Sequence, residues 1–281
     1  MKRLLIIAGS GMLPYYVAKA ARLKNDEPVI ASILNECSFD WKGFECQELP
    51  LGDFCVLRSI LLQYNIGRIV VAGAISIRPS VRDLCFSIKD SFRISKMIWQ
   101  LVSGGDASLL NSIINFLESY GVSVIGAHEI IPDLLAEKGS LGICVPSKDS
   151  RRDIFVAMKS AEALSELEIG QSAISIGGRV VALEGVEGTD YMLQRIVDCR
   201  DNGKIIPGMS GVLVKMCKSQ QDMRADLPSI GEKTVQNVIR AGLSGIALEA
   251  GKSLILEKEL VKKHSDEKGI FVIGIDREFS I

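Results

Sequence analysis

Short apolar segments alternate with segments of helical periodicity through the first half of the chain, and this pattern most limits the possible fold. Residues 3–8 form a nearly continuous apolar run that ends at Gly9, which is typical of a parallel strand buried on both faces. Three further apolar runs follow, at residues 29–34, 68–72 and 122–125. Helical patterns lie between them, at residues 12–24, 53–64, 81–102 and 107–120. Strands separated by helices imply a parallel sheet with right-handed crossovers, so we predict a Rossmann-like α/β domain.

The second half follows a different pattern. Gly177-Gly178 separates two short apolar runs, at residues 171–176 and 179–183, which is a strong signal for an antiparallel hairpin. Further strands are predicted at residues 211–216, 246–248, 254–256 and 271–275. Helices are predicted at residues 149–167, 189–197, 232–240 and 257–267. We therefore predict a mixed α/β C-terminal domain with antiparallel strand pairs.

Three residues that interrupt the periodicity, Gly139, Gly142 and Pro146, mark the expected boundary between the two domains. The predicted domains are residues 1–140 and residues 146–281.

Charge and residue usage exclude several classes of protein. The formal net charge of −1 gives no general electrostatic basis for binding nucleic acid, so an anionic ligand needs local cations or a metal ion. The seven cysteines are scattered and include no Cys-x-x-Cys pair, which argues against zinc ribbons and disulfide frameworks. Two distant histidines offer little for a zinc site or a Ser-His-Asp triad.

The hydrophobic runs argue against export and against a membrane span. No apolar stretch approaches the roughly 20 residues that a spanning helix needs. The basic and apolar N-terminus is interrupted at Gly9-Ser10-Gly11, before a signal peptide would end. We expect a cytoplasmic protein.

The turn Gly9-Ser10-Gly11 is the first candidate ligand site. Two glycines permit close approach of the backbone, and a helix N-terminus presents N–H groups to phosphate or sugar. Pro14, however, stands where a dinucleotide-binding fingerprint has its third glycine. A tight structural turn is the alternative reading.

The segment Glu184-Gly185-Val186-Glu187-Gly188-Thr189-Asp190 runs from a predicted strand to the start of a predicted helix. Its carboxylates could hold a divalent cation while the helix N-terminus meets phosphate oxygens. The alternative is ordinary helix capping, with Thr189 as the cap.

A third candidate is the charged segment that begins at Lys215 and Lys218 and continues as Gln221-Asp222-Met223-Arg224-Ala225-Asp226-Leu227-Pro228. Asp222, Arg224 and Asp226 alternate, so they share one face of an extended chain. Two carboxylates flanking an arginine can bind a metal ion and hold a phosphoryl oxygen. The alternative is a solvated polar connector.

Residues 86–99 combine basic and apolar side chains at helical spacing: Lys89, Phe92, Arg93, Lys96, Ile98 and Trp99. Such a helix could lie on anionic lipid. It could equally pack on its own domain or on a second subunit.

Several motifs together resemble the LpxI-type UDP-2,3-diacylglucosamine pyrophosphatases. The longest are Ala182-Leu183-Glu184-Gly185-Val186-Glu187-Gly188-Thr189-Asp190 and Gln221-Asp222-Met223-Arg224-Ala225-Asp226-Leu227-Pro228-Ser229-Ile230-Gly231. Shorter ones are Gly170-Gln171, Gly9-x-Gly11-x-Leu13-Pro14, Gly105-Asp106, Pro132-Asp133-Leu134-Leu135 and Ala241-Gly242-Leu243-x-Gly245-Ile246. The resemblance covers nearly the whole chain in order.

This resemblance implies a homodimeric, two-domain enzyme of lipid A biosynthesis whose C-terminal domain is catalytic. It implies hydrolysis of UDP-2,3-diacylglucosamine to lipid X (2,3-diacylglucosamine 1-phosphate) and UMP, by attack of water on the α-phosphorus. Mg²⁺ is the implied ion, with Mn²⁺ as an alternative. The family's essential aspartate maps onto Asp226. Ser10, Ala107 and Ser219 depart from the common family pattern, which bears on substrate preference rather than on the reaction.

Roles follow from the resemblance and from side-chain chemistry. The hypothesised catalytic residues are Asp226, Asp190, Thr189, Arg224 and Lys215. The hypothesised substrate-binding residues are Gly9, Gly11, Gln171, Glu187, Gly188, Lys218 and Gln221. The hypothesised metal ligands are Asp226, Asp190 and Asp222, and whether Asp226 acts as a ligand or as a base stays open. The expected partner is a lipid-linked sugar nucleotide, with peripheral contact at the inner membrane and no nucleic acid.

Two other functions are also compatible with the sequence. A Rossmann oxidoreductase would bind a nicotinamide cofactor at the first glycine turn. A non-catalytic protein would bind the sugar nucleotide or a lipid without converting it.

Overall fold

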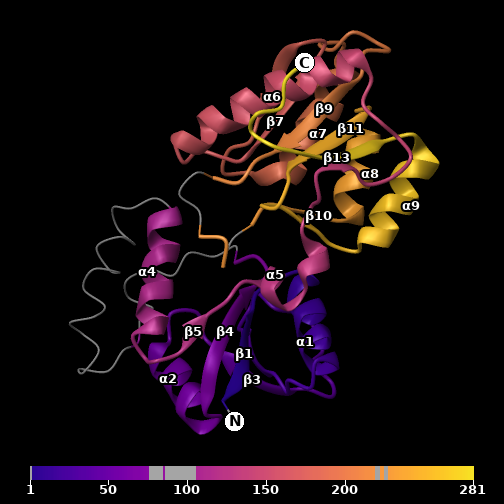
Figure 1. The fold of residues 1–281 in the computed structure, drawn as a ribbon. Coiled ribbons are helices and arrows are strands. Elements are labelled where there is room, and N and C mark those ends of the chain that lie inside the picture. Colours follow the sequence, from indigo (N-terminus) through magenta and orange to yellow (C-terminus); the bar gives the residue numbers. More distant parts are fainter. Residues whose placement is uncertain (1, 76–84, 86–105, 219–221, 225–226) are drawn as a thin grey trace. The chain divides into compact units, whose positions relative to one another are not determined.

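The computed structural model describes residues 2–75, 85, 106–218, 222–224 and 227–281 (Figure 1). These residues form two compact units. The N-terminal unit comprises Met1–Pro132 and Asp222–Asp226, and the C-terminal unit comprises Asp133–Gln221 and Leu227–Ile281. The domain limits 1–140 and 146–281 stay a prediction, because compactness does not show which segment folds on its own.

The N-terminal unit is built on a parallel sheet of five strands in the order β3-β2-β1-β4-β5. The strands are β1 (Arg3–Ala8), β2 (Val29–Ile33), β3 (Glu45–Leu49), β4 (Ile66–Ala72) and β5 (Ser123–Val124). The predicted Rossmann-like parallel sheet is confirmed. The strand order changes direction between β1 and β4, and ligands of open α/β sheets bind outside the strand ends at such a point.

Helices cover both faces of this sheet, which explains the continuous apolar run of β1. Leu5 and Ile7 pack in one core with residues of α2 (Phe54–Gln63) and α4 (Asp106–Glu118). Leu4 and Ile6 pack in a second core with residues of α1 (Leu13–Leu23) and α5 (Ala127–Ile130). A short 3₁₀ helix at Pro132–Leu134 follows.

Most local predictions in this unit are confirmed. The Asp53 side chain caps α2, because its Oδ1 accepts hydrogen bonds from the N–H groups of Cys55 (3.0 Å) and Val56 (2.9 Å). The edge strand β3 was not predicted. The predicted helix at residues 81–102 and the amphipathic segment at 86–99 lie outside the described residues except for Cys85.

The C-terminal unit contains a mixed sheet of six strands in the order β6-β13-β11-β9-β7-β8. The strands are β6 (Gly139–Ser140), β7 (Ser172–Ile176), β8 (Arg179–Leu183), β9 (Gly211–Lys215), β11 (Gly245–Glu249) and β13 (Phe271–Ile275). Strands β9, β11 and β13 are parallel, whereas β6, β7 and β8 pair antiparallel. A separate parallel pair joins β10 (Ser229–Ile230) to β12 (Leu254–Ile255). The predicted mixed domain is confirmed.

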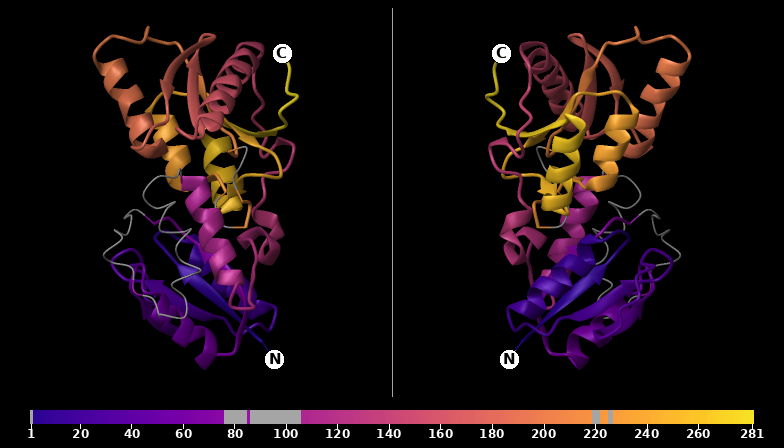
Figure 2. Two further views of the ribbon diagram at one scale, coloured as in Figure 1. Left: turned by 90° about the vertical axis from the view of Figure 1, so that its left-hand side faces the viewer. Right: turned by 90° about the vertical axis from the view of Figure 1, so that its right-hand side faces the viewer.

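Four helices accompany this sheet and can be followed by colour from pink to yellow (Figure 2): α6 (Lys148–Glu166), α7 (Gly188–Asp201), α8 (Glu232–Arg240) and α9 (Lys258–Lys268). Residues of α7, α8 and α9 share one hydrophobic core with Ile174, Leu213 and Ile246 of the sheet. Residues of α6 share another core with Ala173 and Val212. The sheet is therefore buried on both faces here as well.

Two turn predictions have different outcomes. Gly177 (φ 62°) and Gly178 (φ 75°) adopt the left-handed conformations that a tight hairpin turn requires, so the hairpin is confirmed. The prediction that Thr189 caps α7 is wrong. The helix begins at Gly188, with Glu187 before it, and the Thr189 hydroxyl bonds to Glu184 instead. Among the described residues, no helix is both long and apolar enough to cross a membrane.

The residues that follow β1 and β4 are joined by an isolated antiparallel bridge, a close backbone crossing between Ser10 and Ala74. The N–H of Ser10 donates to the carbonyl of Ala74 at 2.8 Å, and the N–H of Ala74 donates to the carbonyl of Ser10 at 3.1 Å. A β-carbon on Gly9 would lie 2.5 Å from the Ala74 oxygen. Glycine at position 9 is therefore required by packing, whatever else it does.

We predict that Gly9→Ala lowers the free energy of unfolding by about 2 kcal/mol, because the added methyl group meets rigid backbone. Urea denaturation measures this. The matched control is Gly231→Ala, where the new β-carbon meets only Leu256 at an ordinary 3.8 Å. Equal stability of the two variants would contradict the crossing as described.

Candidate functional site

A polar cluster of two buried charged residues and a partly buried threonine lies beside strands β7, β8 and β9 of the C-terminal unit. We call Glu184, Thr189 and Lys215 the Lys215 cluster. The Lys215 ammonium donates to the Thr189 hydroxyl at 3.0 Å and to the Ser229 carbonyl at 3.2 Å. The Thr189 hydroxyl donates to Glu184 Oε1 at 2.6 Å. Glu184 and Lys215 are each only 6% exposed. Burying two charged side chains is costly unless they are hydrogen-bonded, as both are here.

Local structure brings these residues together. Lys215 is the last residue of β9 and pairs in register with Ser172 of β7. The Ser172 carbonyl accepts from the Glu184 N–H at 3.0 Å, just after β8. Gly170 permits this close approach of the two backbones, because a β-carbon at position 170 would lie 2.3 Å from the backbone carbonyl oxygen of Glu184.

The cluster combines a cation, a hydroxyl and a carboxylate beside a vacant acceptor. The Gln171 N–H donates to Glu184 Oε2 at 3.1 Å. The Gln171 side-chain oxygen is buried and has no hydrogen-bond donor among the described residues. Such an arrangement can accept a hydroxyl or amide N–H from a ligand while Lys215 supplies positive charge.

Asp190 and Glu187 point to other partners. Asp190 accepts from Asn237 Nδ2 at 2.9 Å and pairs with the Lys233 ammonium at 2.7 Å, so it joins α7 to α8. Glu187 pairs with Arg195 at 2.7 Å. No described contact joins Asp190 to the Lys215 cluster, and the proposed metal-binding role of Asp190 stays a prediction.

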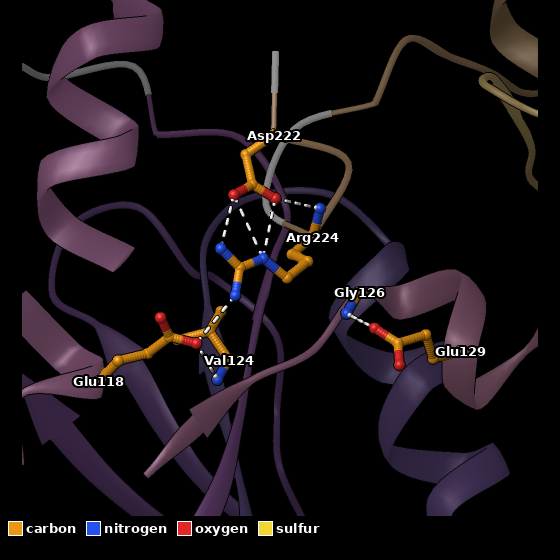
Figure 3. Close-up of polar contacts among 6 residues, drawn as sticks. All are labelled: Glu118, Val124, Gly126, Glu129, Asp222 and Arg224. Carbon is orange, nitrogen blue, oxygen red and sulfur yellow. Dashed lines mark hydrogen bonds and ion pairs between the residues drawn. The ribbon is translucent and has the colours of Figure 1, made fainter. Parts of the chain in front are cut away.

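Asp222 and Arg224 belong to the N-terminal unit and form a tight pair (Figure 3). The Arg224 guanidinium donates to Asp222 from Nε at 3.0 Å and from Nη2 at 2.7 Å. Its Nη1 donates to Glu118 Oε1 at 2.8 Å. The hydrogen bond from Arg224 lowers the pKa of Asp222 below its usual value despite partial burial. Asp222 is therefore an ionised carboxylate at neutral pH.

The remaining predicted residues have varied surroundings. The N–H of Gly9 donates to the Ala72 carbonyl at 2.9 Å, so it is already engaged. Gly11 has a left-handed φ of 88° with open space where a β-carbon would stand. Lys218 is described and half-buried, whereas Gln221 and Asp226 lie outside the described residues. The predicted ligand set therefore stays a prediction.

An ion pair between a buried carboxylate, Glu249, and an exposed arginine, Arg277, anchors the chain after β9, and no local pattern predicts it. Glu249 is 3% exposed and receives hydrogen bonds from Arg277 Nε at 2.8 Å and Nη2 at 3.1 Å. The Cys217 N–H donates to Glu249 at 3.0 Å, and the Cys217 carbonyl accepts from Arg277 at 2.9 Å. Burial alone would raise the pKa of Glu249, but hydrogen bonds from Arg277 and Lys252 outweigh it and lower that pKa.

Three potential metal-ligating groups converge elsewhere in the N-terminal unit. Asp53, Cys55 and Cys85 offer ligand atoms within 4.8 Å of one another. Their thiols would suit zinc rather than magnesium. The hydrogen bond with Cys55, and then the charge of Asp53, raise the pKa of the Cys85 thiol, which keeps it protonated at neutral pH.

We predict that Arg277→Ala lowers the free energy of unfolding by about 3 kcal/mol at neutral pH, since it leaves a buried carboxylate without its main partner. The pKa of Glu249 is lowered by folding, so its contribution is present above the unfolded pKa and is lost as pH falls through the folded value. The difference between wild type and variant should therefore shrink below about pH 4.

Urea denaturation across pH measures both effects, with Lys252→Ala as the matched control. Lys252 also pairs with Glu249, at 3.1 Å, whereas Arg277 donates to both Glu249 oxygens and to the Cys217 carbonyl. The loss of Lys252 should therefore cost less than about 1 kcal/mol. A difference between wild type and Arg277→Ala that does not depend on pH would contradict the assignment.

Comparison with known proteins covers both units. Residues 3–134 match the LpxI N-terminal domain family, and residues 137–273 match the LpxI C-terminal domain family. The chain is also 31% identical over 280 residues to a protein of Caulobacter vibrioides named UDP-2,3-diacylglucosamine pyrophosphatase LpxI, with 98% of each chain covered.

Proposed function

This chain belongs to the LpxI family, and we propose that it hydrolyses UDP-2,3-diacylglucosamine to lipid X and UMP in lipid A biosynthesis. The observation that carries the proposal is the match itself, which runs through both units and covers 98% of a relative named for this activity. The chain is thus a homologue of a pyrophosphate hydrolase. The rest of this proposal concerns how its own residues would act.

Positive charge is the main requirement of the reaction. Attack on a pyrophosphate builds negative charge on the non-bridging oxygens and on the leaving phosphate, so cations placed in advance lower the barrier. Lys215 is held by Thr189 and Ser229 in a buried setting, where its charge is poorly screened. We assign Lys215 to a phosphoryl oxygen. The Thr189 hydroxyl has one proton, which it donates to Glu184, so it would have to release Glu184 to donate to a second phosphoryl oxygen.

The proposed metal ion fits the donor chemistry of this chain. Asp222 is ionised at neutral pH, and Mg²⁺ prefers such hard carboxylate oxygens, as does Mn²⁺. Asp226 with Asp190 or Asp222 would hold the ion, which when bound would polarise a phosphoryl oxygen and neutralise charge. As a base, Asp226 would accept the proton of the attacking water.

The contacts of Arg224 favour a role in positioning its own segment over direct binding of the substrate phosphate. In the described structure its guanidinium faces Asp222 and Glu118 (Figure 3). A phosphate-binding arginine would have to give up at least one of these carboxylates.

Assembly and location are part of the same proposal. We propose a cytoplasmic homodimer that contacts the inner membrane peripherally, since the acyl chains of the substrate would be delivered from a lipid surface. The oxidoreductase alternative loses support, because the N–H groups of Gly9 and Ser10 are engaged by the β4 segment. The non-catalytic alternative is distinguished by product formation.

We predict that Asp226→Ala lowers the rate of UMP release by about 10³-fold or more, because it removes a ligand or base that acts on the reacting water. Chromatographic detection of UMP measures the rate. Binding of the substrate and the melting temperature should change little. The control Asp40→Ala removes an exposed carboxylate that pairs only with Lys42 in the described contacts and should retain full activity. A variant at position 226 with the wild-type rate would exclude the assignment.

We predict that hydrolysis in ¹⁸O-water with Mg²⁺ places the label in UMP, because water attacks the α-phosphorus. Mass spectrometry of both products measures this. Label in lipid X would move the attack to the other phosphorus and contradict the proposed mechanism. Excess chelator should stop both products and added Mg²⁺ should restore them, whereas turnover in chelator would refute metal dependence.

A further inference from the structure

The signature segment, residues 221–231, passes through both units. The chain leaves the C-terminal unit after Gln221, contributes Asp222–Asp226 to the N-terminal unit and returns at Leu227. Its departure is fixed at Cys217 by Glu249 and Arg277. Its return is fixed by pairing of β10 with β12. Both anchors involve residues outside 222–224, and the described contacts of Asp222 and Arg224 lie within the N-terminal unit.

Glu118 supplies a contact of this kind. It is the last residue of α4, and its Oε1 accepts from Arg224 Nη1 at 2.8 Å (Figure 3). Asp222 accepts from the same guanidinium, and the Arg224 N–H also donates to Asp222 Oδ1 at 2.9 Å. The two carboxylates therefore hold Arg224 from opposite ends, and Asp222 and Arg224 are fixed as one unit.

The helix that carries Glu118 is anchored in the core of the N-terminal unit. Its neighbours Ile114 and Leu117 are both buried in the core that α4 shares with the parallel sheet. Glu118 Oε1 also lies 3.4 Å from the N–H of Val124 in β5. A carboxylate on such a support can define the position of a guanidinium that comes from elsewhere in the chain.

Stability alone does not account for this contact. The side chains of Arg224 and Glu118 are 35% and 36% exposed, and ion pairs with that exposure add little to global stability. Their geometric effect is larger, because small displacements of reacting groups reduce turnover strongly. Asp226 follows Arg224 by two residues.

We infer that Glu118 is a positioning residue for the proposed hydrolysis: it holds Arg224 and thereby sets the position of the segment that carries Asp226. This inference rests on the proposed function. It also assigns Arg224 to the support of the segment rather than to the phosphate. Glu118 itself touches no reacting group.

The test compares Glu118→Ala with Glu118→Gln and with a matched control. Glu118→Ala should lower kcat about tenfold with KM within about twofold of wild type, because the segment is displaced while the rest of the site stays intact. Glu118→Gln keeps an oxygen that accepts from Arg224 and should recover part of the loss. The control Glu129→Ala removes a carboxylate that accepts from the Gly126 N–H at 2.7 Å in the same unit (Figure 3) and should leave kcat unchanged.

Hydrogen exchange gives a readout that does not need activity. Peptides covering residues 218–228 should exchange faster in Glu118→Ala than in wild type or Glu129→Ala, whereas peptides covering β11 and β13 should not change. Unchanged exchange, or faster exchange with an unchanged kcat, would overturn the inference. A wild-type chain that releases no UMP would refute the proposed function, and the exchange comparison would still decide whether Glu118 holds the segment.

Discussion

The ion pair between the buried Glu249 carboxylate and Arg277 fixes the point where the chain leaves the C-terminal sheet, and the rest of the candidate site depends on that point. It lies at the carboxyl ends of β11 and β13 and binds both the N–H and the carbonyl of Cys217. Lys215, two residues earlier, is thereby held at the end of β9. The direction in which the chain leaves this sheet is also set there. A buried carboxylate is costly unless it is paired. The partners of Glu249 are Arg277 and the Cys217 N–H, so pairing the carboxylate also fixes the backbone at Cys217.

Two kinds of polar contact then hold the residues of the candidate site. Inside the C-terminal unit, Glu184 and Lys215 are buried and are joined through the Thr189 hydroxyl, so these side chains have little freedom. In the N-terminal unit, Asp222, Arg224 and Glu118 form a more exposed network. The first arrangement suits groups that stabilise charge at fixed positions. The second suits a segment whose position is set by a few directional hydrogen bonds.

Sequence patterns predicted the strands and helices well where burial produces a clear pattern. Strands that are largely buried, such as β1 and β13, appear as apolar runs, and both were predicted with the observed limits. The edge strand β3 was missed because residues such as Glu45 and Glu48 face solvent and interrupt the apolar pattern. Thr189 was assigned as a cap because capping statistics are local, whereas its hydroxyl is taken by Glu184 and Lys215.

The sequence by itself determined the α/β class, the parallel and mixed sheets, and the family. It did so because periodicity and long motifs are properties of neighbouring residues. Only the tertiary structure decided which polar side chains meet. Glu118 lies 106 residues before Arg224, and Glu249 lies 32 residues after Cys217. Hydrogen bonds depend on distance in space, and no local pattern records which distant carboxylate a folded chain will bring to an arginine or to a backbone N–H.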